Sequence, residues 1–121
     1  MIAAAAHFLA GARLRRLRMA GLPADLRPAD EAAAYRVQDA LHGVLSASGH
    51  GAVAGHKIGC TTPVMQAFLG IDHPCAGGVH AVRVFRREAE LDHGDFLHVG
   101  FETEIAVMIG RDLPPRGAPY T

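Results

Sequence analysis

The sequence predicts an α+β fold in which helices come first and strands follow. Within the first 50 residues, apolar side chains recur at the spacing of helical turns. From residue 52 onward, runs rich in β-branched and apolar residues favour strands. Half of the 121 residues are hydrophobic, which is enough for one modest core and excludes a disordered chain. We therefore separate an N-terminal helical region, residues 1–50, from a β-rich region, residues 51–121.

The first predicted helix runs from Ala3 to Met19. Four arginines lie near its end, where positive charge is favourable to the helix dipole, and Gly21 and Pro23 end it. Its apolar positions are Phe8, Leu9, Ala12, Leu14 and Leu17.

A second helix is predicted to begin near Pro28, with acidic residues in its first turn. Its apolar stripe consists of Ala33, Val37, Leu41, Val44 and Leu45. We interpret Tyr35 and Gln38 as residues of the helix surface or the edge of the core. The loop Ser46 to Gly51 follows.

The next stretch predicts a strand, a glycine turn and a short helix. The strand covers Ala52 to Gly59 and points Lys57 and His56 to opposite faces. Thr61 or Thr62 caps a helix that Pro63 opens and Gly70 ends. The turn and helix start expose backbone N–H groups that can receive an anion such as a carboxylate. Gly59, Thr61 and Thr62 are therefore candidate substrate-binding residues, and no phosphate-loop signature is present.

The rest of the chain predicts two further strands. The predicted elements are a loop from Ile71 to Gly78, a strand from Val79 to Phe85, a polar turn from Arg86 to Asp95, and a long central strand from Leu97 to Ile109 that bends at Gly100.

Glu102 and Glu104 are candidate metal ligands in that central strand. A strand has a side-chain period of two, so both carboxylates share one face, about 7 Å apart. They repel each other unless a cation lies between them, and hard oxygen donors suit Mg²⁺ or Mn²⁺. An exposed strand face is the alternative, because Glu88 and Glu90 have the same spacing in a polar hairpin.

Lys57 is the one lysine among twelve basic residues, the other eleven being arginine. A chain so rich in arginine is expected to use arginine for general surface charge. Lysine differs in having a pKa that its surroundings can shift far enough for proton transfer. Lys57 is therefore a candidate catalytic residue, although the bias itself also arises by chance.

Charge and hydropathy exclude several classes of partner. The formal net charge is zero, and only Arg13 to Arg18 are clustered, so we predict no nucleic-acid partner. No apolar run reaches membrane-spanning length, so we predict no membrane partner. An arginine-rich leader ending near Ala24 resembles an organellar transit peptide but has no serine. Cys60 and Cys75 lack zinc-site spacing, which favours free thiols and a cytoplasmic location.

Four motifs occur in order along the chain. They are Ala34-Tyr35-x-Val37-Gln38; Gly55-His56-Lys57-Ile58-Gly59-Cys60-Thr61; Met65-Gln66-x-x-Leu69-Gly70-Ile71-Asp72-x-Pro74; and Glu102-Thr103-Glu104-Ile105-Ala106, followed by Arg111-Asp112-Leu113. Together they resemble the 2-keto-4-pentenoate hydratase branch of the fumarylacetoacetate hydrolase superfamily. The resemblance covers nearly the whole chain.

The resemblance implies a mixed β-roll or barrel preceded by helices, with residues 51–121 as the first, incomplete part of the catalytic domain. It also implies Mg²⁺ or Mn²⁺ bound by three carboxylates. Glu102 and Glu104 fall on the Glu-x-Glu pair, and Lys57 falls on the active-site lysine. The third carboxylate is expected beyond Thr121, because members of the family are longer than this chain.

The activity implied by the resemblance is a metal-dependent hydration in the breakdown of aromatic compounds. Water adds to 2-hydroxy-2,4-dienoates or 2-oxo-4-enoates. The metal would bind the substrate's carboxylate and keto oxygen and stabilise an enolate as a Lewis acid. Lys57, its pKa lowered by the metal, would transfer the proton. Sister enzymes decarboxylate 2-oxo-3-enedioates or cleave acylpyruvates, so these residues do not select the reaction.

Two departures leave other functions open. Many hydratases have Asp where this chain has Cys75, so the resemblance supplies no acid–base partner there. With the third carboxylate also missing, a catalytically silent fragment or partner subunit is the main alternative. Thiol chemistry at Cys60 or Cys75 lacks a clear base, although His73 lies near. We expect a homo-oligomer, because part of a β-barrel leaves unpaired edges and apolar surface.

Overall fold

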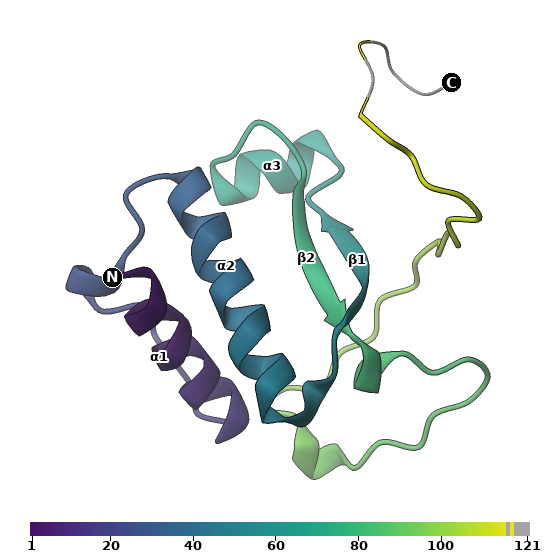
Figure 1. The fold of residues 1–121 in the computed structure, drawn as a ribbon, viewed down its shortest axis with the longest axis horizontal. Helices are drawn as coiled ribbons and strands as arrows, with labels where there is room; N and C mark the ends of the chain where they lie inside the picture. Colours follow the sequence, from purple (N-terminus) through teal and green to yellow (C-terminus); the bar gives the residue numbers. More distant parts are fainter. Residues whose placement is uncertain (116, 118–121) are drawn as a thin grey trace.

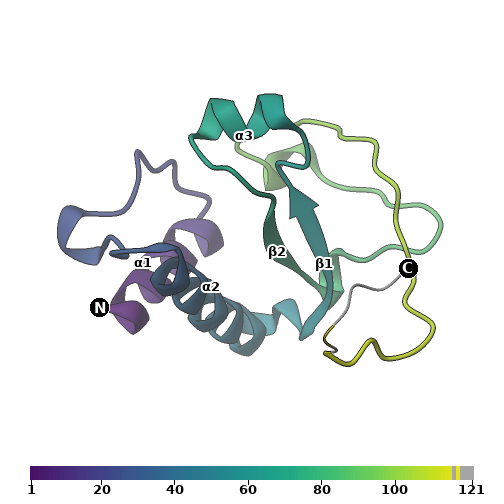
Figure 2. The same cartoon turned by 90° about the horizontal axis from the view of Figure 1, so that it is seen from above.

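The computed structural model describes residues 1–115 and 117, and it has an α+β fold. Its main elements are the helices α1 (Ile2–Leu14), α2 (Glu31–Leu45) and α3 (Pro63–Leu69) and the strands β1 (Val53–Gly59) and β2 (Cys75–His80). α1, α2, β2 and β1 lie side by side in that order (Figures 1 and 2). The predicted α+β class is confirmed, whereas the β-roll and the division at residue 50 stay predictions.

The interface between α1 and α2 is built largely from alanine. The buried hydrophobic residues are Ala5, Ala6, Ala10 and Ala12 of α1 and Ala33, Val37 and Leu45 of α2. The larger apolar residues of the first helix contribute less to this interface, since Phe8 is 40% exposed and Leu14 is 44% exposed. Small side chains let the two helices approach closely. The resulting core is small, and Leu45 is its one large, fully buried side chain among the described residues.

Both helices are shorter than predicted, for local reasons. α1 ends at Leu14 because its arginine run remains at the surface and Arg16 adopts a left-handed conformation with φ 52°. α2 begins at Glu31, not at Pro28, because Asp30 is its N-cap. The Asp30 carboxylate accepts a hydrogen bond from the Ala33 backbone N–H at 2.7 Å.

The two strands form an antiparallel sheet, and α2 is hydrogen bonded to one of them, β2. β1 confirms the predicted strand, and Gly59 at its end pairs with Cys75 at the start of β2. Tyr35 and Gln38 on α2 hydrogen bond to the two backbone polar groups of one β2 residue, Ala76. The Ala76 N–H donates to the Tyr35 hydroxyl at 3.1 Å, and the Gln38 amide donates to the Ala76 carbonyl at 3.1 Å.

The position of β2 corrects the predicted loop and strand after residue 70. The predicted strand from Val79 to Phe85 is wrong, because pairing already begins at Cys75 and Ala81–Arg83 form a helical turn. Of the two glycines in β2, Gly78 has a packing role. A Cβ on Gly78 would lie 2.6 Å from a ring carbon of His42, so α2 approaches the strand closely where the side chain is missing.

The predicted central strand from Leu97 to Ile109 is also wrong. No described residue beyond His80 belongs to a strand, and this segment runs outside the helices and sheet (Figure 1). Ile105 on one predicted face is 95% exposed and Met108 on the other is 83% exposed, so neither face of the predicted strand is covered. A strand needs a hydrogen-bonding partner, and within the described chain β1 and β2 pair only with each other. The apolar composition of residues 97–109 favours a strand, but it does not specify a partner for it to pair with.

Candidate functional site

Lys57 and two glutamates form the cluster that we take as the candidate site. Lys57 lies near the end of β1, and its ammonium donates to the Glu102 carboxylate at 2.7 Å. The same ammonium is also hydrogen bonded to the Glu104 carboxylate. The structure thus brings together three residues that are 45 and 47 positions apart in the chain.

The electrostatics of the cluster follow from these two hydrogen bonds. Hydrogen bonding to Glu102, and then to Glu104, raises the pKa of Lys57 above its ordinary value. The bond from Lys57 lowers the pKa of Glu102. This is opposite to the lowered pKa expected for Lys57 beside a metal. The reason is that two anionic acceptors stabilise the ammonium form of Lys57.

The setting of the cluster differs from the expected strand face. Glu102 and Glu104 lie in an extended segment outside the sheet, not on a strand. The side chains of Lys57 and Glu104 are each 48% exposed, and that of Glu102 is 74% exposed. The carboxylates therefore converge on the lysine, but they do so at the surface.

The predicted substrate-binding residues lie directly after β1. Gly59 ends the strand, Thr62 caps α3, and Gly70 ends that helix with φ 70°, as predicted. The Thr62 hydroxyl accepts from the Met65 backbone N–H at 3.4 Å, so the cap already uses this side chain. Thr61 is exposed between them. The turn begins at Gly59, two residues after Lys57, so β1 positions both the turn and the lysine.

A small pocket between α2 and the start of β2 was not predicted. It has a volume of about 350 Å³ and is lined by Glu31, Ala34, Tyr35, Gln38, Ile71, His73, Cys75 and Ala76. His73 and Glu31 form an ion pair across it at 3.1 Å. A hydrogen bond to the Pro74 carbonyl, followed by the charge of Glu31, raises the pKa of His73. The sequence feature that could have predicted this pocket is the spacing of Tyr35 and Gln38, which places both polar side chains on one face of the helix.

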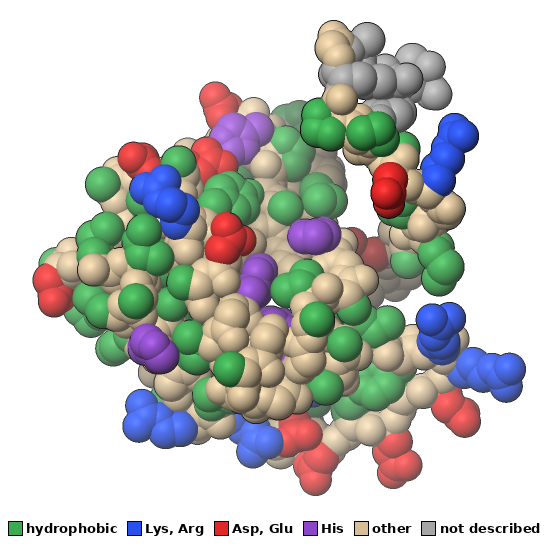
Figure 3. Space-filling model, viewed as in Figure 1, with side chains coloured by type: hydrophobic (Ala, Val, Ile, Leu, Met, Phe, Trp, Pro, Cys, Tyr) green, Lys and Arg blue, Asp and Glu red, His purple; other side chains and the backbone are tan. Residues whose placement is uncertain are grey.

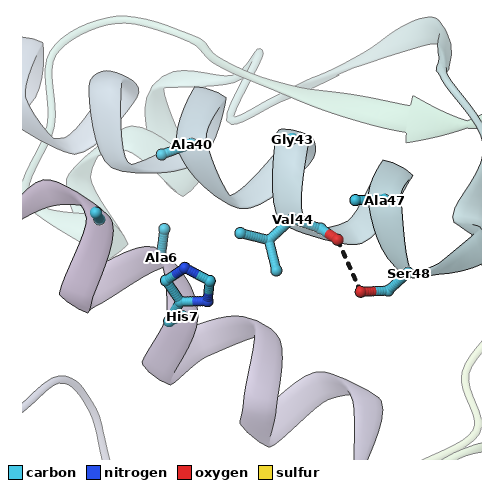
Figure 4. A pocket seen from close by; sticks show the side chains of 8 residues that line it. Ala6, His7, Ala40, Gly43, Val44, Ala47 and Ser48 are labelled. Carbon is cyan, nitrogen blue, oxygen red and sulfur yellow. Dashed lines mark hydrogen bonds between the residues drawn. The ribbon is translucent and has the colours of Figure 1, made fainter.

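A larger hollow lies between α1 and the end of α2 (Figure 4). Its lining is mostly alanine, glycine and valine, with His7 and Ser48 as its polar side chains. The Ser48 hydroxyl donates to the Val44 carbonyl at 2.8 Å. This hollow contains no carboxylate and none of the predicted site residues, so we do not assign the chemistry to it.

The donor set at Glu102 and Glu104 fits two of the ligands of a divalent cation. Mg²⁺ is commonly held in proteins by one or two carboxylates together with water and substrate oxygens. In this structure the two carboxylates already converge on one positive group, the Lys57 ammonium. Within the described part of the chain, no three His, Cys, Asp or Glu side chains are arranged to hold a metal.

Comparison with known proteins identifies a class of enzymes to which the chain is related. The chain is 34% identical over 117 residues to 2-keto-4-pentenoate hydratase 1 of Dechloromonas aromatica, covering 97% of this chain and 44% of that protein. It is 34% identical over 92 residues to hydratase 2 of the same organism, covering 76% of this chain and 35% of the relative. Over 84 residues it is 32% identical to the Burkholderia vietnamiensis 2-keto-4-pentenoate hydratase, covering 69% and 32%.

The chain is thus related to hydratases. In particular, its relatives are 2-keto-4-pentenoate hydratases, and the resemblance predicted from the motifs is confirmed. The chain spans less than half the length of these curated relatives. Neither a family model nor a solved structure matches it. No helix among the described residues is long and apolar enough to cross a membrane.

Proposed function

We propose that this chain belongs to a divalent-metal-dependent hydro-lyase that adds water to 2-hydroxy-2,4-dienoates or 2-oxo-4-enoates in aromatic-compound breakdown. Its similarity to 2-keto-4-pentenoate hydratases supports the reaction. The hydrogen bonds of Lys57 with Glu102 and Glu104 are the observation on which we assign these residues to the active site. These are the one lysine of the chain and the carboxylate pair expected to bind metal.

In this proposal Glu102 and Glu104 hold Mg²⁺ or Mn²⁺, and Lys57 moves the proton. The ion, when bound, supplies a Lewis acid for the carboxylate and keto oxygens of the substrate. Lys57 then loses its two carboxylate acceptors, so its pKa falls toward the range useful for proton transfer. Its amine exchanges a proton with C3 of the 2-oxo acid.

The turn after β1 is the proposed binding site for the substrate's carboxylate end. Backbone N–H groups at Gly59, Thr61 and Thr62 are the donors, because the Thr62 hydroxyl is used by the cap of α3. The turn follows Lys57 closely in sequence, so one strand positions both the proton-transfer group and the anion donors. Substrates without a carboxylate should therefore bind poorly.

We further propose a cytoplasmic homo-oligomer that acts on a small 2-oxo acid, without nucleic-acid or membrane partners. Large exposed apolar residues on α3 and beyond residue 95 support self-association, among them Phe68, Phe101 and Met108. Sedimentation of the 121-residue chain is expected to find association or poor stability. A compact monomer that melts cooperatively would contradict this expectation.

The function is tested with the protein expressed from its own gene. Hydration of a 2-hydroxy-2,4-dienoate should be detectable by loss of the diene absorbance, should stop on chelation, and should return with Mg²⁺ or Mn²⁺. Glu102→Gln and Glu104→Gln should each weaken the dependence on metal and lower turnover sharply. Glu88→Gln and Glu90→Gln are matched controls, because this pair has the same spacing in another exposed segment. Equal losses from both pairs, or turnover unaffected by chelation, would refute the proposal.

A further inference from the structure

Cys60 and Cys75 lie side by side where the two strands meet. Their sulfur atoms are 3.8 Å apart, although 14 residues separate them in the sequence. The pairing of β1 with β2 creates this proximity, since Gly59 pairs with Cys75 and Cys60 is the next residue. Both thiols are half-buried and unbridged.

The backbone at Cys60 is held in a conformation that does not suit cysteine. Its φ is 57°, in the left-handed region where side chains other than glycine are uncommon. The Gln66 side chain fixes this turn by donating to the Cys60 carbonyl at 2.9 Å. Burial, and then the Cys75 thiol, raise the pKa of the Cys60 thiol. A strained position thus carries a thiol aimed at a second thiol.

We propose that Cys60 and Cys75 form a reversible disulfide that joins the end of β1 to the start of β2. The partner reagent is a low-molecular-weight disulfide. One cysteine thiolate attacks a sulfur of that reagent, which releases one small thiol and leaves a mixed disulfide. The other cysteine attacks the protein sulfur of the mixed disulfide and releases the second small thiol. Two electrons pass from the protein sulfurs to the reagent, and both thiol protons end on the released thiols.

The proposal is independent of the hydratase activity, and so is its test. The protein expressed from its own gene is equilibrated with glutathione and glutathione disulfide and quenched, and its mass and that of the peptides containing Cys60 and Cys75 are measured by mass spectrometry. The native fold should raise the effective concentration of one thiol for the other by about tenfold or more over the value in guanidinium. The product should be a monomer lighter by two hydrogen atoms. An effective concentration that is the same in guanidinium would overturn the proposal.

A displaced thiol provides the matched control. Cys75→Ser combined with Gly77→Cys moves the second thiol along β2 to the position paired with Lys57, while the loop in the unfolded chain stays nearly the same length. Its native effective concentration should fall toward the denatured value. If this double variant closes a disulfide as readily as the original pair, the geometry of Cys60 and Cys75 is not responsible and the proposal fails. Cys60→Ser and Cys75→Ser should give only mixed disulfides with glutathione.

Discussion

Residues 1–83 and residues 84–115 are held in place by different kinds of interaction. In the first region, buried alanines join α1 to α2, and Tyr35 and Gln38 hydrogen bond to the backbone N–H and C=O of Ala76 in β2. The second region is largely exposed and has no helix or strand longer than the turn His93–Asp95. Figure 3 shows its outer part standing away from the body of the molecule, with charged and hydrophobic side chains uncovered.

Charged side chains attach the second region to the first. Arg16 pairs with Asp95, the Arg18 guanidinium donates to the Leu97 carbonyl at 3.4 Å, and Lys57 pairs with both glutamates. Figure 2 shows this segment passing on the β1 side of the sheet. The candidate site therefore combines a lysine placed by strand pairing with carboxylates placed mainly by that lysine.

The largest expected effect tests whether Lys57 does more than attach the glutamates. In the protein expressed from its own gene, Lys57→Arg should lower kcat for a 2-hydroxy-2,4-dienoate by about 10²–10⁴, as loss of a general acid–base group does. Arginine keeps the charge, but its pKa above ~12 prevents proton exchange near neutral pH. Metal affinity, measured by calorimetry, should change little. A variant that retains most of its kcat would make Lys57 a structural or electrostatic residue.

Two neighbouring glycines test how tightly the first region is packed. Gly78→Ala should destabilise the fold by about 1–3 kcal/mol, because its Cβ overlaps the His42 ring that α2 presses on the sheet. Gly77→Ala is the control, since a Cβ there meets nothing within 4 Å. Urea unfolding compares the two free energies. Equal effects would show that α2 does not pack on β2 as closely as the structure indicates.

The same contrast explains which elements were predictable from sequence. Thr62 caps α3 and Gly70 ends it, as predicted, because capping depends on residues a few positions apart. The segment containing Ile105 has the composition of a buried strand, but pairing and burial depend on a partner that composition does not specify. The start of β2 at Cys75 was missed for a related reason, since the fit of Gly78 under His42 joins distant parts of the chain.

The candidate site was predictable in its chemistry and not in its setting. The one lysine and the Glu-x-Glu spacing singled out Lys57, Glu102 and Glu104, which the structure brings together. The period-two spacing assumed a strand to orient the carboxylates, and the ion pairs do so without one. Tyr35 and Gln38 were interpreted as residues of the helix surface or the edge of the core, and both are half-buried; nothing local shows that the backbone of Ala76 bonds to their polar atoms.

His42 should make the first region sensitive to acid. Burial, and then the neighbouring His80, lower the pKa of His42 below its ordinary value of 6.5. The unfolded chain therefore takes up the proton at a higher pH than the folded chain does. The associated stability is fully present above pH 6.5 and is lost as the pH falls through the folded pKa. Urea unfolding across this range should show the decline, and His42→Gln should flatten it. An unchanged decline in His42→Gln would place the acid sensitivity elsewhere.

The smallest expected effect concerns the charges that attach residues 84–115. Exposed ion pairs contribute about 0.2–1 kcal/mol each and weaken as salt is added, because the Debye length shrinks to about 3 Å near 1 M. Trypsin should therefore cut after Arg86 and Arg87 faster in high salt, while the urea midpoint of the remainder stays unchanged. The raised pKa of Lys57 sets the upper end of the pH range in which these ion pairs attach the segment, because the contribution of Lys57 is lost as the pH rises through its folded pKa, above 10.5. The lowered pKa of Glu102 sets the lower end of this pH range, because the contribution of Glu102 is lost as the pH falls below 4.5.

Asp95→Asn should speed cleavage by at most about fivefold, the factor that corresponds to 1 kcal/mol. Glu90→Gln serves as the control, because within the described residues Glu90 forms no ion pair. Cleavage that responds to neither salt nor Asp95→Asn would mean that apolar contacts, not charges, hold this segment against β1.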